Sequence, residues 1–308
     1  MKILYLTHGI INQEEKRNFY DTLVEMGHDV EYLNYVKIMD DYGKQYLNYF
    51  IVHRAEIFKP DLVFSILYED QIEYETFGTL RKLGFKVMNL FCDDHWRYNA
   101  SGYIGTRSWL PYLDYAITVF DKAVDWYKAD GFNGVILSQW GANPKHYKPL
   151  DLPKKYDVTF IGQKYGDRGT LIDKLCSVGI NAKAFGRGFT DDKPLEFHDY
   201  LRIVSQSKIN INTSECSSKQ GTQMKARSFE IPCCKGFLLN EKYYELDKFF
   251  TPKEMVQWNG FDDLVGKIRY FLSHDKERKE IAERAYKRIL KEHTYVHRFE
   301  KIFNEMSF

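Results

Sequence analysis

The stretch GANPKHYKPLDLPKKYD, residues 141–157, separates two similar halves of the sequence. Its three prolines are mixed with lysines. Proline fixes its own φ angle and has no backbone N–H to donate, so closely spaced prolines interrupt helices and strands. Stretches of this composition often connect domains. We therefore predict a linker here, between a first domain at residues 1–150 and a second at residues 151–308.

Short runs of branched and aromatic residues recur on both sides of this linker, with helical patterns between most of them. Phe19, Leu23 and Met26, for instance, are spaced as on one face of a helix. The predicted strands are residues 2–7, 29–34, 61–67, 85–91, 114–120 and 134–140 before the linker, and 156–162, 180–186, 208–213 and 236–240 after it. The predicted helices of the second half lie within residues 171–178, 194–206, 264–271, 277–292 and 295–303.

Strands that alternate with helices imply an α/β fold in which helices cover both faces of a parallel sheet. The sequence thus predicts two domains, each a parallel sheet covered by helices on both faces. Open α/β sheets bind ligands at the carboxyl ends of their strands. Two such sheets facing each other would form a cleft, and we expect a substrate to bind there.

The composition limits the classes of partner. The chain has 308 residues, of which 44% are hydrophobic, so it can form substantial cores. Its 44 cationic and 43 anionic residues give a net charge of +1. That balance gives no support for a nucleic-acid or membrane surface, although a local basic cleft stays compatible with it. We find neither a signal-peptide pattern nor an apolar run near the roughly 20 residues that span a bilayer.

The five cysteines show no spacing typical of a metal site or a disulfide framework. This usage favours a reducing, cytoplasmic location. Cys233 and Cys234 are adjacent, and we interpret them as small buried thiols at a helix–strand junction.

The first candidate site in the second half is FIGQKYGDRG, residues 160–169. Gly162 and Gln163 follow a predicted strand, and Arg168 stands where the next helix begins. A strand, a glycine loop and a helix N-terminus form an anion site, to which an arginine adds a fork suited to phosphate. The pattern is neither a Walker sequence nor G-x-G-x-x-G, so nicotinamide cofactors are not favoured. A plain turn with a solvated arginine is the alternative.

A second glycine loop, AFGRG, ends the next predicted strand. Gly186 within it would let the backbone approach a flat base closely, although an ordinary turn explains it equally well.

The most highly charged candidate is SSKQGTQMKARSFEIPCCKGFLL, residues 217–239. A helix over residues 223–231 would place three polar side chains on one face, namely Gln223, Arg227 and Glu230. Pro232 would end that helix. An arginine for phosphate and a carboxylate for ribose hydroxyls are what a nucleoside diphosphate needs. The alternative is an ordinary intrahelical ion pair.

In the first half, NLFCDDHWRYN continues the predicted strand at residues 85–91. Asp93 and Asp94 at its carboxyl end could orient a hydroxyl, accept its proton or bind a metal ion. They point in different directions if extended, which argues against a shared metal, and one of them could cap a helix. His8, after the first strand, would face the same cleft, although a lone histidine is often structural.

Five segments taken together, FCDDHWRY, SQWGANPKHYKP, YDVTFIGQKYGDR, QMKARSFEIPCCKGFLL and HTYVHRF, resemble the CgeB-like (spore-maturation) glycosyltransferases of bacteria. The similarity runs from about Asp61 to Phe303 and is strongest in the second half. It implies a GT-B architecture of two Rossmann-like domains, in which the second binds a nucleotide-sugar donor and the first an acceptor. The last helix, within residues 295–306, would cross back to the first domain. Enzymes of this fold usually need no catalytic metal and no further cofactor.

The resemblance also implies roles for individual residues. Glu230 matches the position whose carboxylate binds the donor ribose, and Lys225, Arg227 and Arg168 match the cationic region near the diphosphate. The first glutamate of the Glu-x7-Glu pattern that many retaining enzymes show is missing before Glu230, so the stereochemical outcome stays open.

On the acceptor side, Asp94 or His8 would serve as the base of an inverting reaction. Asp93 lies beside them, Trp96 could stack on a sugar or an aromatic acceptor, and Arg97 could hold an anionic one.

The sequence therefore predicts a glycosyltransferase that moves a sugar from a nucleoside-diphosphate donor to a hydroxyl of a glycan, a protein or a small molecule, without a metal. One alternative is a non-catalytic protein of the same fold that binds sugar nucleotides or glycans. Another is an enzyme that glycosylates nucleic-acid bases, which the neutral net charge does not support.

Overall fold

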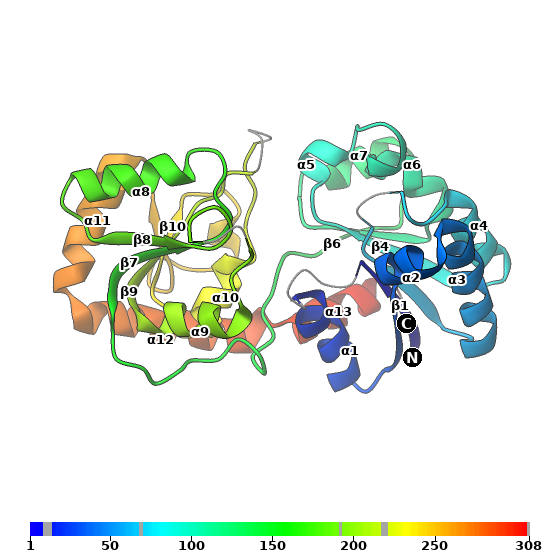
Figure 1. The fold of residues 1–308 in the computed structure, drawn as a ribbon, viewed down its shortest axis with the longest axis horizontal. Coiled ribbons are helices and arrows are strands. Elements are labelled where there is room, and N and C mark those ends of the chain that lie inside the picture. The colour runs from blue at the N-terminus through cyan, green and yellow to red at the C-terminus, as the bar shows by residue number, and fades with distance from the viewer. Residues whose placement is uncertain (9–13, 68–69, 191–192, 217–220, 307–308) are drawn as a thin grey trace. The chain divides into compact units, whose positions relative to one another are not determined.

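Two separate parallel sheets organise the chain in the computed structural model (Figure 1). Each belongs to its own unit: unit 1 is Met1–Gln139 with Tyr295–Phe308, and unit 2 is Trp140–Thr294. The structure describes residues 1–8, 14–67, 70–190, 193–216 and 221–306. Residues 217–220, at the beginning of the charged stretch of the second half, lie outside the described ones.

The sheet of unit 1 has the strand order β2-β1-β3-β4-β5-β6, and all neighbouring strands are parallel. Side chains alternate along a strand, so Leu4 and Leu6 of β1 point to one face and Tyr5 points to the other. Both faces are apolar and covered. The strands are β1 (Lys2–Thr7), β2 (Asp29–Asn34), β3 (Leu62–Ser65), β4 (Lys86–Phe91), β5 (Tyr115–Thr118) and β6 (Val135–Leu137).

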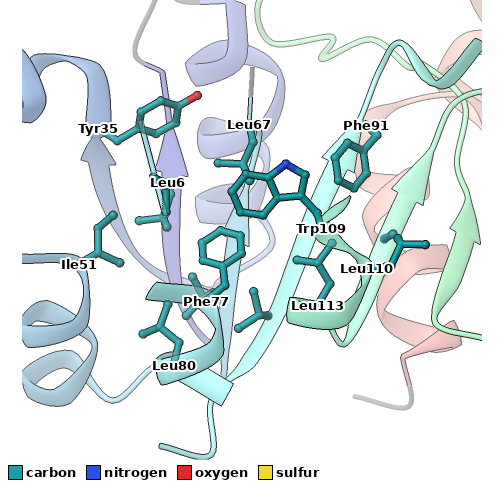
Figure 2. Close-up of a cluster of buried hydrophobic side chains, with 14 of the residues drawn as sticks. Leu6, Tyr35, Ile51, Leu67, Phe77, Leu80, Phe91, Trp109, Leu110 and Leu113 are labelled. Carbon is teal, nitrogen blue, oxygen red and sulfur yellow. The ribbon is translucent and has the colours of Figure 1, made fainter. Parts of the chain in front are cut away.

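Figure 2 shows the larger core of unit 1, in which the fully buried Trp109 lies among Phe77, Phe91 and Leu113. The Trp109 indole N–H donates a hydrogen bond to the carbonyl of Tyr103 (2.9 Å), so its one polar atom is satisfied. The helices of unit 1 are η1 (Lys16–Tyr20), α1 (Asp21–Glu25), α2 (Tyr35–Tyr42), α3 (Lys44–Phe58), α4 (Tyr74–Lys82), α5 (Asp94–Arg97), η2 (Gly102–Ile104), α6 (Thr106–Trp109), η3 (Leu110–Tyr112), α7 (Ala123–Ala129) and α13 (Tyr295–Glu305).

Helix α13 comes from the far end of the chain and covers the other face of this sheet. Three aromatic rings meet there edge to face: Phe64 of β3, Phe19 of η1 and Phe299 of α13, with centroid separations of 5.9–6.3 Å. The hydroxyl of Tyr115 donates to the carbonyl of Met306 (3.3 Å) beyond the helix. Residues 295–306 therefore form part of the core of unit 1.

The sheet of unit 2 has the order β11-β10-β9-β7-β8 and is also parallel. Phe160 of β7 joins a core under α8, α11 and α12, whereas the next residue, Ile161, joins the core under α9 and α10. The elements are β7 (Tyr156–Ile161), α8 (Arg168–Ser177), β8 (Ala182–Phe185), α9 (Phe197–Gln206), β9 (Ser207–Asn212), α10 (Arg227–Cys233), β10 (Leu238–Glu241), η5 (Leu246–Lys248), β11 (Val256–Trp258), α11 (Phe261–Ser273) and α12 (Asp275–Glu292).

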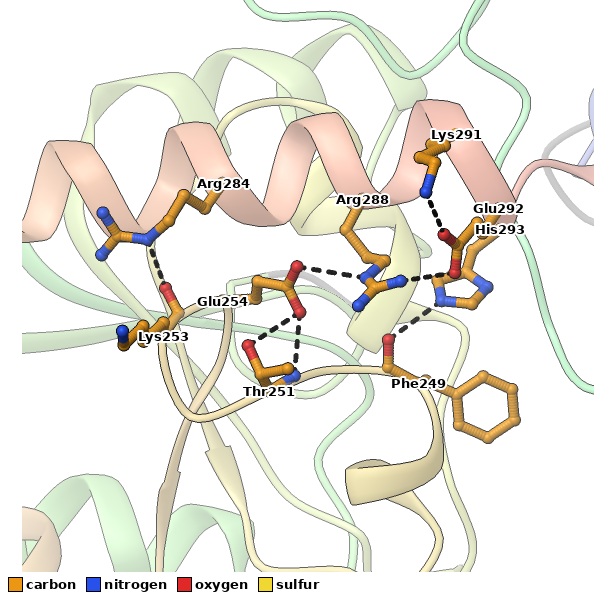
Figure 3. Close-up of polar contacts among 9 residues, drawn as sticks. All are labelled: Phe249, Thr251, Lys253, Glu254, Arg284, Arg288, Lys291, Glu292 and His293. Carbon is orange, nitrogen blue, oxygen red and sulfur yellow. Dashed lines mark hydrogen bonds and ion pairs between the residues drawn. The ribbon is translucent and has the colours of Figure 1, made fainter.

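Polar contacts attach the loop before β11 to the end of α12 (Figure 3). Arg288 of α12 donates from Nε to Glu254 (3.1 Å), and Glu254 also accepts from the backbone N–H (2.8 Å) and the hydroxyl (3.0 Å) of Thr251. Arg284 donates to the carbonyl of Lys253 (2.7 Å). These contacts hold one face of the highly charged helix α12 against the loop before β11.

Every strand predicted from the sequence is present, but the charged helix differs from its prediction. Helix α10 begins at Arg227, not at Gln223, and it continues through Pro232 to Cys233. Gln223 donates its backbone N–H to Ser214 (2.9 Å), beside a bridge between Thr222 and Glu215. This extended pairing takes precedence over the helix, so the predicted face shared by Gln223, Arg227 and Glu230 is wrong for Gln223. The short strand β11 was not predicted.

The chain passes from unit 1 to unit 2 between Gln139 and Trp140. The boundary predicted from the sequence lies about ten residues later, between residues 150 and 151. The proline-rich stretch at residues 141–157 belongs to unit 2. Tyr147 within it is buried, and its carbonyl accepts a hydrogen bond from the thiol of Cys233 (3.1 Å). In the described ranges, no helix combines the length and the apolar character needed to cross a membrane.

Replacement of Trp109 should test the core of unit 1. Trp109→Ala removes a fully buried indole and should lower the free energy of unfolding of this unit by about 3–5 kcal/mol. Urea unfolding followed by circular dichroism measures the change. Tyr49→Ala is a suitable control, because this side chain is 64% exposed and its loss should change stability by less than about 0.5 kcal/mol. Equal urea midpoints for Trp109→Ala and Tyr49→Ala would contradict the assignment of Trp109 to the core of unit 1.

Candidate functional site

The candidate residues of unit 2 gather where the strand order of its sheet reverses. β7, the first strand of the unit, lies between β8 and β9 in the sheet. Ligands of open α/β sheets bind outside the carboxyl ends of the strands at such a point. The loops after β7 and β9 and the start of α10 meet there, and they carry Gly162, Arg168 and Arg227.

Arg227 presents unused hydrogen-bond donors at this position. Its Nε donates to the side-chain oxygen of Asn212 (2.9 Å), and its guanidinium lies over the ring of Phe160. Nη2 is buried and has no hydrogen-bond partner among the described residues. Nη1 would lie 3.0 Å from a Cβ placed on Gly162, so the group points at the β7–α8 loop. A buried donor without an acceptor is costly, and a bound anion would satisfy it.

A buried amide pair orients Arg227. Asn212 and Asn240 face each other in the parallel register of β9 and β10, and the side-chain N–H of Asn212 donates to Asn240 (2.8 Å). The hydroxyl of Ser228 donates to the same oxygen of Asn240 (2.9 Å). The amide oxygen of Asn212 is thereby left for Arg227. Neither asparagine was predicted from the sequence, although Asn212 ends an apolar strand and Asn240 lies one residue before the end of another.

Arg168 binds the protein itself. It is only 2% exposed and donates to Thr213 (3.2 Å), to the carbonyl of Gln163 (3.0 Å) and to the carbonyl of Glu215 (3.1 Å). Its guanidinium also stacks on Tyr165 at 3.6 Å. Burial, with the nearby charge of Arg227, lowers the pKa of Arg168 to about 10. The expected direct contact with a diphosphate does not fit these contacts, which connect the loops after β7 and β9.

Lys225 adds a third positive charge to the cluster. Its Nζ lies 3.2 Å from the sulfur of Cys216. Burial lowers the pKa of the Lys225 amine, and the charges of Arg227 and Arg168 lower it further. Such mutual repulsion is relieved by a negatively charged ligand.

Glu230 and Gly186 complete the predicted donor set. Glu230 lies on α10 after Arg227 and is 5% exposed, and the hydroxyl of Tyr200 donates to its carboxylate (3.4 Å). Gly186 has a φ of +118°, and a Cβ there would come within 2.5 Å of the carbonyl oxygen of Gly162. Only glycine permits this approach of the two loops, whereas Gln163 beside them is exposed.

In unit 1, the corresponding reversal of strand order lies at β1, which ends beside His8. Nδ1 of His8 is 3.4 Å from a carboxylate oxygen of Glu15, an ion pair when the imidazole is protonated. The other oxygen of Glu15 accepts a short hydrogen bond from the hydroxyl of Thr7. A histidine held by a carboxylate is the arrangement of an oriented general base. His8 was predicted from the sequence, whereas Glu15 was not.

Asp94 lies inside unit 1 and does not face an open strand end. Its side chain is 0% exposed and accepts hydrogen bonds from Thr106 (2.7 Å) and Tyr127 (3.0 Å). Burial raises the pKa of Asp94 to about 6, although hydrogen bonds from Thr118, Thr106 and Tyr127 oppose the rise. A base must reach the acceptor hydroxyl. The expected role of Asp94 therefore does not fit this placement, which makes it an internal acceptor.

The three predicted acceptor contacts differ in exposure. Arg97 is buried and donates to the carbonyls of Ile104 (2.9 Å) and Leu67 (3.4 Å), so it stabilises the local backbone. Trp96 is 38% exposed, and Asp93 at the start of α5 is partly exposed. Only these two reach the surface. In the part of the chain that the structure describes, no group of three or more His, Cys, Asp or Glu side chains is placed to hold a metal ion.

Comparison with known proteins identifies a family model and several solved structures that are similar to this chain. Residues 151–304 match the model of a family described as glycosyl transferase-like. HepE from Anabaena, in complex with UDP-glucose, aligns at a TM-score of 0.66 and 14% identity, over 100% of this chain and 99% of that chain. Sucrose-phosphate synthase from Thermosynechococcus elongatus gives 0.62 and 10%, over 100% and 98%.

A third similar structure is the DNA-modifying enzyme β-glucosyltransferase, solved with and without uridine diphosphoglucose. It aligns at a TM-score of 0.60 and 13% identity, over 100% of this chain and 98% of that chain. At these identities the likeness concerns the fold, and it confirms the predicted GT-B class with two Rossmann-like sheets. No curated protein sequence matches the chain.

The buried carboxyl of Asp94 should make stability depend on pH. Its pKa of about 6 in the folded chain lies above the ordinary 3.8, so its stabilising contribution is complete below about pH 4 and is lost as the pH rises through 6. The shift corresponds to about 3 kcal/mol. The free energy of unfolding of Asp94→Asn, relative to the unmodified protein, should rise by this amount between pH 4 and pH 7.

Urea unfolding at a series of pH values measures this difference. Tyr127→Phe is the matched variant, because it removes a hydrogen bond that favours the ionised carboxyl and should move the transition to higher pH. A difference between Asp94→Asn and the unmodified protein that stays constant with pH would contradict the interpretation.

Proposed function

Because the chain belongs to the glycosyl transferase-like family, we propose that it transfers a sugar from a uridine-diphosphate donor to a hydroxyl group of an acceptor. The enzyme class follows from the family, whereas the donor is supported by the UDP and UDP-glucose complexes of HepE, which has the same fold. The order of the sequence motifs supports the CgeB-like branch as the finer assignment. Unit 2 would bind the donor and unit 1 the acceptor.

The observation that supports donor binding most directly is the set of unused donors on Arg227. They lie at the carboxyl ends of β7 and β9, where a nucleotide is expected. A guanidinium binds phosphate oxygens through charge-assisted hydrogen bonds. Glu230, on the same helix, carries the carboxylate that we assign to the ribose hydroxyls.

These cations also suit the chemical step. When the bond between the anomeric carbon and the β-phosphate oxygen breaks, the electron pair stays on the diphosphate. Arg227 and Lys225 would stabilise that developing charge, with Arg168 fixing the loop between them. We therefore propose a reaction that needs no metal ion.

On the acceptor side, His8 is the base that we favour over Asp94. The acceptor oxygen would attack the anomeric carbon while its proton passes to His8, and the carboxylate of Glu15 would stabilise the resulting imidazolium. This route inverts the anomeric configuration. A retaining reaction without a protein base is the alternative, and the configuration of the product distinguishes the two. Trp96 and Asp93 are the surface groups left to contact the acceptor.

Arg227→Gln should weaken UDP binding by roughly 10- to 100-fold, because charge-assisted hydrogen bonds contribute about 1.5–3 kcal/mol. Isothermal titration calorimetry with UDP measures the change. Arg269→Gln is the matched control, since this exposed arginine bonds only the carbonyl of Val178 in the described structure. Unchanged affinity in Arg227→Gln would rule out this arginine as the phosphate contact.

His8→Asn should reduce turnover by about two to four orders of magnitude, because it removes the proton acceptor. The dissociation constant of UDP should stay the same, since His8 belongs to unit 1. UDP release from UDP-glucose, assayed with oligosaccharides, small hydroxyl compounds and DNA as acceptors, gives turnover and acceptor class together. Normal turnover in the variant would exclude His8 as the base.

A further inference from the structure

Glu215, in the loop after β9, occupies the N-terminus of α8. Its carboxylate oxygens lie 3.1 and 3.4 Å from the backbone nitrogen of Asp167, which donates to them. A Cβ on Gly166 would come within 1.9 Å of one of these oxygens, and the φ of Gly166 is +54°. The backbone of Gly166 and Asp167 thus forms a cradle that already contains an anionic group.

The main chain of Glu215 is held in place by hydrogen bonds from two neighbouring side chains. The carbonyl of Glu215 accepts hydrogen bonds from Arg168 (3.1 Å) and Tyr165 (3.3 Å). The backbone of Glu215 also forms an antiparallel β-bridge with Thr222. The residue as a whole is partly exposed. The carboxylate can therefore leave the cradle by rotation about its own side-chain bonds, without rearrangement of the loop.

The same loop is the place where a diphosphate would bind. The first backbone N–H groups of a helix are unpaired, and the helix dipole favours a negative charge beside them. Arg227, with its buried and unpartnered Nη2, points at the Gly162 end of this loop, whereas Glu215 fills the Gly166 end. A diphosphate on Arg227 that also reached the start of α8 would meet the Glu215 carboxylate. Two anions cannot share these donors without strong repulsion.

We propose that Glu215 is an internal competitor of the donor, which occupies the diphosphate position of the empty site and must be displaced when the donor binds. This inference rests on the proposed function. In the empty site, Glu215 satisfies the backbone N–H of Asp167 and offsets part of the charge of Arg168. Only a ligand that engages both Arg227 and the start of α8 gains enough contacts to expel it. Glu215 therefore sets the affinity for donor and product and discriminates against smaller anions.

Titration calorimetry with UDP, inorganic pyrophosphate and uridine tests this role. Glu215→Gln keeps an acceptor for the N–H of Asp167 but removes the charge. It should bind UDP and pyrophosphate on the order of tenfold more tightly than the unmodified protein. Uridine, which has no phosphate, should bind both proteins equally. Glu215→Ala should also bind UDP more tightly, and melting temperatures show whether either variant has lost its fold.

The matched control is Asp173→Asn, which changes the net charge equally at an exposed position farther along α8. It should bind UDP as the unmodified protein does. If Arg227→Gln weakens UDP binding while both Glu215 variants bind UDP no more tightly than the unmodified protein, the role of Glu215 is overturned and the donor site stands. If UDP and pyrophosphate bind neither the unmodified protein nor the Glu215 variants, both proposals fail. If the Glu215 variants bind UDP more tightly while Arg227→Gln binds UDP as the unmodified protein does, the role of Glu215 is supported. Arg227 is then excluded as the phosphate contact.

Discussion

The hydrogen bond between Asn212 and Asn240 is the constraint on which the candidate site depends. The two amides are opposite each other because β9 and β10 are paired in one parallel register, and a slip by one residue would turn one of them into the other face of the sheet. Asn240 is further fixed by Ser228 at the start of α10. With both amides oriented, only one acceptor remains for Nε of Arg227, and this sets the direction of the whole guanidinium. The position of this cation at the candidate site is thus determined by buried, uncharged groups.

Much of the fold could be predicted from the sequence because its signals are local. Apolar runs such as that of β1 and the spacing of Leu264, Ile268 and Phe271 in α11 depend only on neighbours along the chain. β11 escaped prediction because a polar glutamine interrupts its three residues, whereas the equally short β6 is a continuous apolar run. The beginning of α10 was misplaced because a bridge between Thr222 and Glu215, which no local pattern encodes, holds the preceding residues extended.

The candidate site was predictable to the extent that it follows strand ends. That rule places Gly162 and His8 at strand ends, where the structure has them. It fails for Asp94, because the chain folds Thr106 and Tyr127 back over the strand end and encloses the carboxyl. It also gives no indication of Glu15 or Glu215, since each acts through a contact with a different loop. Residue type and position along a strand thus predict which residues reach the site, but burial and partners come from segments distant in sequence.

The discontinuous composition of unit 1 has a consequence for biosynthesis. Its last helix, α13, is translated only after all of unit 2, yet Phe299 of that helix covers Phe64 of the first sheet. While the ribosome makes residues 140–294, the nascent chain therefore holds a sheet with one apolar face only partly covered. Unit 2, by contrast, is continuous and can complete its core as soon as it emerges. The later half of this chain is thus the first to be finished, and the earlier half must wait, exposed to chaperones, for its final helix.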